Sequence, residues 1–475
     1  MSIVNDKNDI GGMTTSTRDE DTNVVEIDTP LQQLELDEAE KEKRSIARKK
    51  LIESIYTTTK FTPRAQLCQP KRSTTAPPRQ YNPPMKLTKK QTQEKLTEQL
   101  LRLRDAIMPQ KSEIKARKGT VHRIQKMIRQ VFPTADIKVH LFGSVRSGLA
   151  TKKADMDFCL TVDLRTLPQS FLTTVERKRK FGSDKIDEFP PLGQYDRSIK
   201  PPKKLFTMTN TEIIEIQGDL IRLIVDKIGE YCSSSGDYIN IKPLPLARIP
   251  IVKLTDSRSK MHCDIGINNI LALRNTELIE TYLKCDDRVA LLCMAVKHWA
   301  KQRSLNDPYH GSLSSYSYVI MVLHMLQRRK ILPYLQQEHV EESEKVQVGP
   351  YDASFSADIK KLKWKADPAT KLLSVGELLI EFFRYYGHQF SFSENVVCVR
   401  KEGVLTKIEK NWTSDKSTPR MKYNFCIEDP FEITHNLARV VNTDGLYWIR
   451  GEMMTSFEML ARGVTFDRVC NGFRR

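Results

Sequence analysis

Two aspartates separated by one residue lie inside an apolar run. Asp155 and Asp157 flank Met156, and Phe158 with Cys159 continues the run. In a β-strand, residues two apart project from the same face, so both carboxylates would point to one place. Like charges this close repel each other unless a cation lies between them, and paired carboxylates suit Mg²⁺ or Mn²⁺. The pattern predicts a divalent metal site, with the polar end of a strand as the alternative.

A third carboxylate, Asp264, lies in the second apolar strand pattern, "KMHCDIGINN". If this strand pairs beside 155–160, the three carboxylates can hold two divalent ions about 4 Å apart. Phosphoryl and nucleotidyl transfer need mainly positioning and charge stabilisation, which such ions provide. Upstream, Gly143 permits close backbone approach to a phosphate, and Ser144 adds a hydroxyl at the same turn.

Cations and hydroxyls follow at helical spacing. Lys297 and Lys301 are four residues apart, so both ammonium groups would face one way. Ser314 or Ser315 would cap the next helix, where free N–H groups attract phosphate. Tyr316 is near enough to that helix start to stack on a base. Each feature also has a plain structural explanation: a solvated cationic stripe, an ordinary serine cap and a packed tyrosine.

The chain as a whole is basic. Its 475 residues carry a net charge of +17, with a pI near 9.3, which favours a polyanionic partner such as nucleic acid or an anionic membrane. The start of the chain has no signal-peptide core, and no apolar run approaches the ~20 residues of a membrane span, which argues against the membrane. The nine cysteines are scattered without a CxxC pair. We therefore expect neither a zinc site nor disulfides, and a cytoplasmic or nuclear protein.

The pattern along the chain predicts an α+β fold with a helical second half. Residues 1–90 are typical of a disordered polar and basic tail, either a solvated arm or one that guides RNA. Residues 91–275 predict a catalytic unit of helices and mixed strands. Within it, 164–205 looks inserted: it has turn residues and a basic bias but no periodicity, and would either contact RNA or only decorate the surface. Over residues 276–475 the pattern predicts helices at 286–303, 315–329, 372–386, 430–440 and 451–462.

Taken in order, the motifs resemble a known family. They are FGS (142–144), DMD (155–157), DIGINN (264–269), KHWAK (297–301), SSY (314–316) and EDPFE (428–432). Together they resemble the DNA polymerase β-type nucleotidyltransferases that extend RNA 3′ ends, and among these the caffeine-induced-death family of poly(U) polymerases. The similarity spans about 95–165 and 210–465, and "IEDPFEITHNLARVV" (427–441) is its most specific part. It implies a nucleotidyltransferase palm and a helical poly(A)-polymerase-associated domain with the active site between them.

The resemblance also implies roles for the matched residues. The catalytic, metal-binding carboxylates would be Asp155, Asp157 and Asp264. The triphosphate would be held by Gly143, Ser144, Lys297, Lys301 and Ser315. The sugar and base would contact Asn269, Asn275 and Tyr316, the last by stacking. The base edge would be read by Asp429, Glu432 and His435. The family's gap between the second and third aspartates is shorter, which marks 164–205 as an addition.

His435 bears on the choice of base. Uracil presents an O4 acceptor and an N3–H donor, and adenine presents the opposite pattern. An N–H of His435 can donate to O4, while Asp429 can accept from N3–H directly or through water. A site built on hydrogen bonds rejects a mismatched analogue strongly, and the imidazole also takes space that a purine would need. A lone histidine after such a turn is otherwise more often structural; here the family resemblance favours the base-reading role.

The sequence thus predicts a template-independent RNA nucleotidyltransferase that adds UMP from UTP to RNA 3′ ends with two Mg²⁺ or Mn²⁺ ions. An ATP-using poly(A) polymerase is the nearest alternative, and an enzyme with small oligoadenylate products is a more distant one. A catalytically dead RNA-binding scaffold is the alternative from another class, against which the intact aspartates argue. Single-stranded RNA 3′ ends would be held mainly through backbone charge. No membrane contact and no oligomer is indicated.

Overall fold

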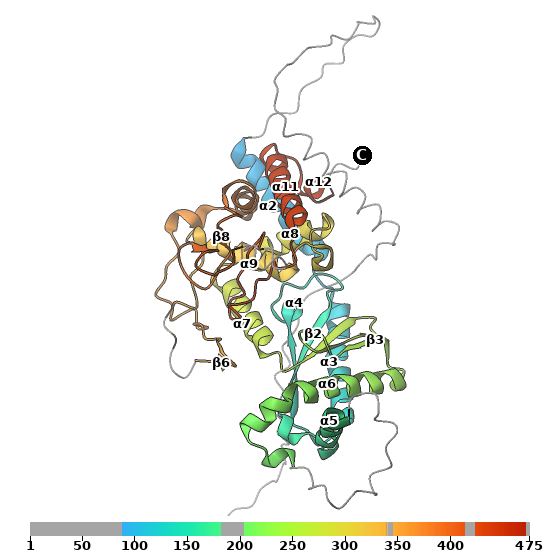
Figure 1. Ribbon diagram of the computed structural model, residues 1–475. Helices are drawn as coiled ribbons and strands as arrows, with labels where there is room; N and C mark the ends of the chain where they lie inside the picture. Colours follow the sequence, from blue (N-terminus) through green and yellow to red (C-terminus); the bar gives the residue numbers. More distant parts are fainter. Residues whose placement is uncertain (1–87, 182–203, 339, 341–344, 414–422, 472–475) are drawn as a thin grey trace, which may run out of the picture.

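The computed structural model describes residues 88–181, 204–338, 340, 345–413 and 423–471. The expected tail at 1–90 lies almost wholly outside these residues. Figure 1 shows β2 and β3 with α3, α5 and α6 in the lower half, and α2, α8, α9, α11 and α12 in the upper half. The helices α4 and α7 lie between the two halves.

The lower half contains a five-stranded mixed sheet. Its strands are β1 (Ile137–Phe142), β2 (Met156–Val162), β3 (Tyr238–Leu244), β4 (Ile251–Asp256) and β5 (His262–Ile267). They are arranged in the order β1-β2-β5-β4-β3. β2 and β5 run parallel, while the other pairs are antiparallel. The register places Asp157 opposite Asp264 and Asp264 opposite Lys253. The predicted pairing of the two aspartate-bearing strands is therefore confirmed.

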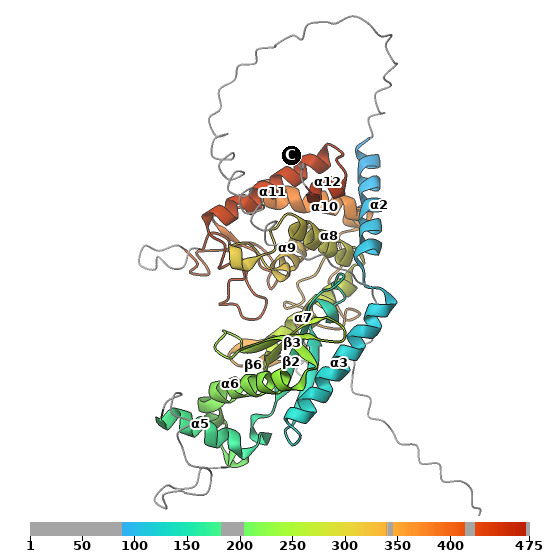
Figure 2. The same cartoon turned by 90° about the vertical axis from the view of Figure 1, so that its right-hand side faces the viewer.

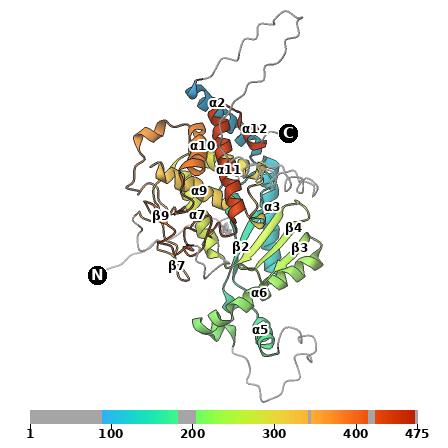
Figure 3. The same ribbon diagram turned by 45° about the horizontal axis from the view of Figure 1, so that its top comes forward.

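Helices cover one face of this sheet. They are α3 (Lys111–Val131) and α6 (Asn210–Ser235), and α5 (Gln169–Phe181) packs against α6 at the lower end. Alternate strand residues such as Phe158 and Ile265 are buried with both helices in one apolar cluster. Because side chains alternate along a strand, Asp157, Asp264 and Lys253 project from the opposite face. Figure 3 shows the sheet with α3 and α6 alongside it.

The upper half is helical and has its own core. Its helices are α8 (Arg288–Gln302), α9 (Ser315–Arg328), α10 (Val375–Arg384), α11 (Thr443–Ala461) and α12 (Phe466–Asn471). Two-residue strands form the pairs β6 (Gln347–Val348) with β7 (Tyr351–Asp352), and β8 (Asn395–Val396) with β9 (Leu405–Thr406). The core of this half is built around fully buried side chains such as Trp299 and Phe383, whose rings meet edge to face with their centroids 4.8 Å apart.

Two helices connect the halves. α7 (Ile270–Cys285) follows β5 and contributes Leu278 and Tyr282 to the upper core. α2 (Lys89–Ile107) precedes α3 and also packs in the upper core, through Leu96 and Leu100. Figure 2 shows α2 running beside the upper helices and α3 continuing down along the sheet. The short helix α4 (Gly143–Arg146) sits between β1 and β2.

The α+β fold class is confirmed, but two local expectations were wrong. Residues 430–440 form turns rather than a helix, because the Asn436 side chain bonds the backbone of Ile427, Phe425 and Ala438 and so fixes a looped path. Within 164–205, α5 is a helix that buries Phe171, Leu172 and Val175. The remaining residues, 182–203, are not described. No helix in the described parts of the chain is apolar and long enough for a bilayer span.

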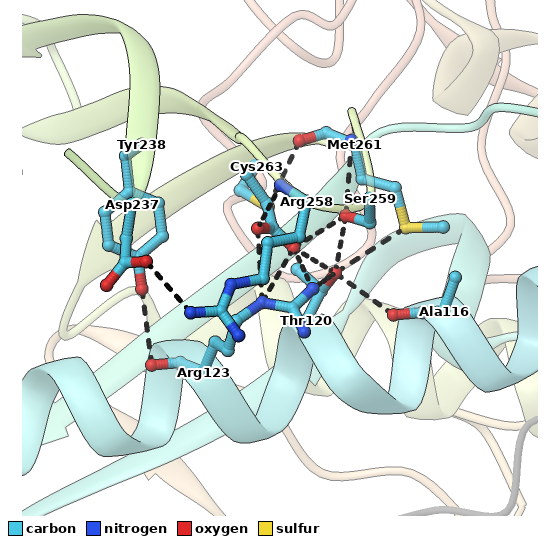
Figure 4. A network of polar contacts seen from close by, with 10 residues as sticks. Ala116, Thr120, Arg123, Asp237, Tyr238, Arg258, Ser259, Met261 and Cys263 are labelled. Atoms are coloured by element: carbon cyan, nitrogen blue, oxygen red, sulfur yellow. Dashed lines mark hydrogen bonds and ion pairs between the residues drawn. The ribbon is translucent and has the colours of Figure 1, made fainter.

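A buried polar network fastens α3 to the sheet. The Asp256 carboxylate accepts hydrogen bonds from the Thr120 hydroxyl at 2.7 Å and the Ser259 hydroxyl at 2.6 Å, and forms an ion pair with Arg123. Figure 4 shows Thr120, Arg123 and Ser259 converging there. Although burial alone would raise the pKa of Asp256, the hydrogen bonds from Arg123, Ser259 and Thr120 lower it to about 2. This aspartate is held as an anion by the protein itself.

Candidate functional site

The three predicted carboxylates lie on the sheet face that the helices leave open. Asp157 is on β2, Asp264 faces it from β5, and Asp155 immediately precedes β2. Burial raises the pKa of Asp157 to about 7, with the negative charges of Asp264 and Asp155 adding to the effect. Burial and the charge of Asp264 also raise the pKa of Asp155. The protein therefore brings like charges together without neutralising them fully.

The donor set suits a divalent cation in its chemistry. All three are hard oxygen donors, and their mutual repulsion is what a bound cation relieves. Lys253 on β4 already forms an ion pair with Asp264, so a positive charge occupies part of this position. As they stand, no three His, Cys, Asp or Glu side chains among the described residues are grouped closely enough to hold a metal. Metal binding thus calls for Asp264 to exchange Lys253 for the ion.

Gly143 is required where β1 turns into α4. Its φ is +70°, and a Cβ at this position would collide with the Asp157 carboxylate. A glycine here avoids both the strain of a left-handed backbone and the clash. Its own N–H donates to the Thr276 hydroxyl at 3.0 Å, so this N–H is engaged within the protein. Gly143 therefore makes room for Asp157, while Ser144 presents its side chain at the turn.

A cavity of about 840 Å³ opens from this point toward the helical half. Its volume is within the usual range of small-molecule sites, ~300–1,000 Å³. Most of the predicted site residues line it: Gly143, Ser144, Asp155, Asp157, Asn275, Lys297, Lys301, Ser315 and Tyr316. These residues come from α4, from β2 and from the residue just before β2 on the palm side, and from α7, α8 and α9 on the other side. The cavity therefore lies between the two halves.

The cationic side of the cavity is α8. Lys297 and Lys301 both line it, as their four-residue spacing predicted. Burial lowers the pKa of Lys297 to about 8, partly offset by nearby Asp157. Its ammonium donates to the Leu149 carbonyl at 2.7 Å, which fixes its position. A bound polyanion would favour the charged form further.

The start of α9 supplies hydroxyls. Ser314 is the N-cap, and its oxygen accepts from the Ser317 N–H at 3.1 Å. Ser315 lines the cavity, and its oxygen accepts from the Asn306 amide at 2.9 Å. Because a serine hydroxyl has a single hydrogen, this bond leaves the hydrogen of Ser315 available for an acceptor in the cavity. Ser314 thus caps the helix, while Ser315 presents a donor to the cavity.

The far end of the cavity is organised by Asp429. Its carboxylate accepts from the N–H groups of Phe431 and Glu432, each at 3.0 Å, and from the Asn275 amide at 3.3 Å. The Tyr316 hydroxyl also donates to it, at 3.5 Å. Asp429 therefore anchors a turn and orients Asn275 and Tyr316, which line the cavity while Asp429 does not. The Asn275 carbonyl oxygen is buried and has no partner, which leaves an acceptor for a ligand.

Five predicted residues lie off the cavity wall: Asp264, Asn269, Asp429, Glu432 and His435. Asp264 is placed by its register opposite Asp157, and Asn269 occupies the N-cap position of α7. His435 closes the Asp429 turn, since its N–H donates to the Glu432 carbonyl at 2.7 Å. Burial and the charge of Arg248 lower the pKa of His435, which favours the neutral imidazole with one N–H.

Several contributing residues carry no sequence signal of their own. Lys253 is placed by the β4–β5 register, and Thr276 by its position on α7 beside Gly143. Asn306 and Arg248 act through hydrogen bonds to predicted residues, Ser315 and Glu432. Of these, only Asn306 could have been suspected from proximity in sequence, since it lies nine residues before Ser315.

Comparison with known proteins agrees with this arrangement. Residues 96–284 match the family described as poly(A) RNA polymerase, mitochondrial-like, central palm domain. Residues 374–435 match the Cid1 family poly A polymerase domain. The two matches include the carboxylates of the palm and the Asp429–His435 turn.

Individual relatives match over most of the chain. Terminal uridylyltransferase cid1 of Schizosaccharomyces pombe is 33% identical over 364 residues, which cover 73% of this chain and 74% of that protein. Poly(A) RNA polymerase cid13 of the same organism is 30% identical over 383 residues, covering 80% of this chain and 55% of that protein. A solved structure of Cid1 superposes with a TM-score of 0.61 at 30% identity, covering 80% of this chain and 98% of that one. The chain therefore belongs to the Cid1 family of poly(U) and poly(A) polymerases.

Proposed function

We propose that this protein is a template-independent nucleotidyltransferase that adds UMP from UTP to single-stranded RNA 3′ ends. The observation that carries the proposal is the facing pair Asp157 and Asp264 beside a cavity that also holds two lysines, the Ser315 hydroxyl with its hydrogen available, and an unpartnered amide oxygen. Nucleotidyl transfer requires carboxylates, cations and a polar end of the cavity that can take the sugar or the base of the nucleotide.

Each part has a task in this reaction. Asp155, Asp157 and Asp264 would hold two divalent cations, which when bound activate the RNA 3′ hydroxyl and stabilise the leaving pyrophosphate. Lys297 and Lys301 neutralise the triphosphate, and the Ser315 hydroxyl donates to a phosphate oxygen. Relatives have been solved with magnesium nucleotides, including Cid1 with MgGTP. Asn275 accepts from a hydroxyl or N–H of the nucleoside, and the Tyr316 ring packs against its base.

The choice of UTP rests on the turn at Asp429. Neutral His435 carries an N–H that suits the O4 acceptor of uracil, as the sequence predicts. Solved relatives include Cid1 bound to the UTP analogue UMPNPP and to its short product ApU. The basic chain, with a net charge of +17, favours a polyanionic acceptor such as RNA.

An extension assay tests the proposal. An unstructured, labelled RNA is incubated with Mg²⁺ and each of the four nucleoside triphosphates in turn, and product length is read on a gel. We expect extension with UTP to exceed extension with the other three. Extension with ATP instead would make the protein a poly(A) polymerase, as cid13 is named. No extension with any nucleotide and either Mg²⁺ or Mn²⁺ would refute the proposal.

A substitution tests the basis of selection. In His435→Asn the imidazole that excludes a purine is gone, so the ratio of kcat/KM for UTP to that for ATP should fall by about tenfold. Extension with UTP itself should continue. An unchanged ratio would show that selection lies elsewhere in the site.

A further inference from the structure

One ion pair spans the two halves of the molecule beside the site. Arg248 lies between β3 and β4 on the palm, and Glu432 lies in the Asp429–His435 turn on the helical half. Both oxygens of Glu432 accept from the same guanidinium nitrogen of Arg248, each at 3.0 Å. The two residues are 184 positions apart in sequence, so this contact exists only when the halves are together.

The pair holds the turn at its middle. Glu432 donates its N–H to Asp429, and its carbonyl accepts from the N–H of His435. A contact that restrains Glu432 therefore also restrains Asp429 and His435. Through Asp429 the restraint extends to Asn275 and Tyr316 on the cavity wall.

Arg248 also lies close enough to His435 to affect it. Burial is the main cause that lowers the pKa of His435, and the positive charge of Arg248 is the next. Glu432 and Asp429 act in the opposite sense, and Arg439 in the same sense as Arg248. One palm cation thus contacts the turn and favours the neutral imidazole.

We infer that Arg248 is a positioning residue for nucleotide selection: by bridging to Glu432 it holds the Asp429–His435 turn against the palm in the arrangement that reads the base. The inference rests on the proposed function and assigns Glu432 to this bridge rather than to direct contact with the base. The pair is in contact with solvent, since 46% of the Arg248 side chain and 25% of the Glu432 side chain are exposed. An exposed pair of this kind contributes modestly, so the effect is one of tuning.

A charge exchange tests the bridge. R248E places two like charges together, and we expect KM for UTP to rise about fivefold while kcat stays within twofold, because the carboxylates and lysines are untouched. The UTP-to-ATP preference should fall as well. E432R should behave in the same way. The double variant R248E/E432R restores the pair with its charges exchanged and should return KM and preference to within about twofold of the original protein.

Two outcomes would overturn the inference. If the double variant is as impaired as E432R alone, Glu432 serves the nucleotide directly. If R248E leaves both KM and preference unchanged, the bridge has no part in selection. R258E is the matched control, because Arg258 also pairs with a carboxylate, that of Asp237 at 3.3 Å, but within the palm. It should leave KM and preference unaltered.

Further measurements separate this inference from failure of the proposed function and from misfolding. Thermal unfolding of R248E should match that of the original protein, and the milder R248Q gives a second reading if it does not. Raising the KCl concentration should shrink the difference in KM for UTP between R248Q and the original protein, because salt screens an exposed ion pair. If the protein extends no RNA, affinity for a non-hydrolysable UTP analogue, measured by calorimetry, replaces KM. The inference then requires that the double variant R248E/E432R restore this affinity.

Discussion

Two aspartates of the same sheet are held in opposite electrostatic states. Asp256 at the end of β4 is fully buried, yet its pKa is lowered to about 2 by hydrogen bonds that outweigh burial. Asp157 on β2 has its pKa raised to about 7 by burial and by two neighbouring carboxylates. The first has an arginine and two hydroxyls as partners, whereas the second faces another aspartate.

Under the proposed function, the difference separates a structural carboxylate from a metal-binding one. At Asp256 the fold supplies every partner, so nothing further is needed to stabilise the charge. At Asp157 the fold gathers negative charge and leaves part of it uncompensated, which costs stability and prepares the place for a cation. The comparison predicts that the two residues respond in opposite ways to the same substitution.

The largest expected effect is on turnover. Asp157→Ala and Asp264→Ala should each reduce kcat by roughly 10³-fold or more, because metal positioning carries the chemistry. Asp157→Asn should be at least as stable as the original protein, since it removes a repelling charge. Extension kinetics and urea unfolding measure the two quantities. Near-normal extension by either alanine variant would remove these residues from catalysis.

The next effect is on stability. Asp256→Ala leaves Arg123 beside a buried gap and breaks the network that joins α3 to the sheet, so we expect a loss of about 3 kcal/mol in the free energy of unfolding. Activity per folded molecule should remain close to normal below the unfolding transition. A variant that unfolds like the original protein but has lost its activity would reverse the roles assigned to the two aspartates.

The catalytic side of this comparison was predictable from the sequence because it follows local periodicity. Alternation along β2 places Asp157 on the open face, and helical spacing brings Lys297 and Lys301 to one wall. The structural side was not predictable. Ser259 is close in the chain, but Thr120 and Arg123 come from α3, more than a hundred residues before Asp256, and nothing in their spacing marks them.

The region around Asp429 shows where the sequence misleads. An apolar pattern over 430–440 predicts a helix, but side-chain bonds from Asn436 to the backbone favour a turn. The resemblance implies that Asp429 reads the base, and this stays a prediction. In the structure its carboxylate accepts from two N–H groups, an amide and a phenol. The sequence marks a polar residue there, but its bonds to Asn275 and Tyr316 are visible only in the structure.

A smaller effect is expected at Gly143. In Gly143→Ala the new Cβ pushes the Asp157 carboxylate aside, so kcat should fall by up to about 10²-fold, the cost of displacing a reacting group by about 1 Å. Gly148→Ala is the control, because Gly148 also has a positive φ, +78°, but nothing lies within 4 Å of its Cβ position. It should show the strain without a comparable loss of activity. Equal losses in both variants would mean that backbone strain, not Asp157, is responsible.

The smallest effect is a dependence on pH that distinguishes Asp256 from its asparagine variant. Because the pKa of Asp256 is about 2 in the folded protein and its ordinary value is 3.8, folding favours the charged form. The stability it contributes is fully present above pH 3.8 and is lost as the pH falls from 3.8 toward 2. The difference in urea midpoint between the original protein and Asp256→Asn should therefore be constant from pH 5 to 7 and shrink below pH 4. A difference that stays constant down to pH 3 would show that the carboxylate is held by shape rather than by its charge.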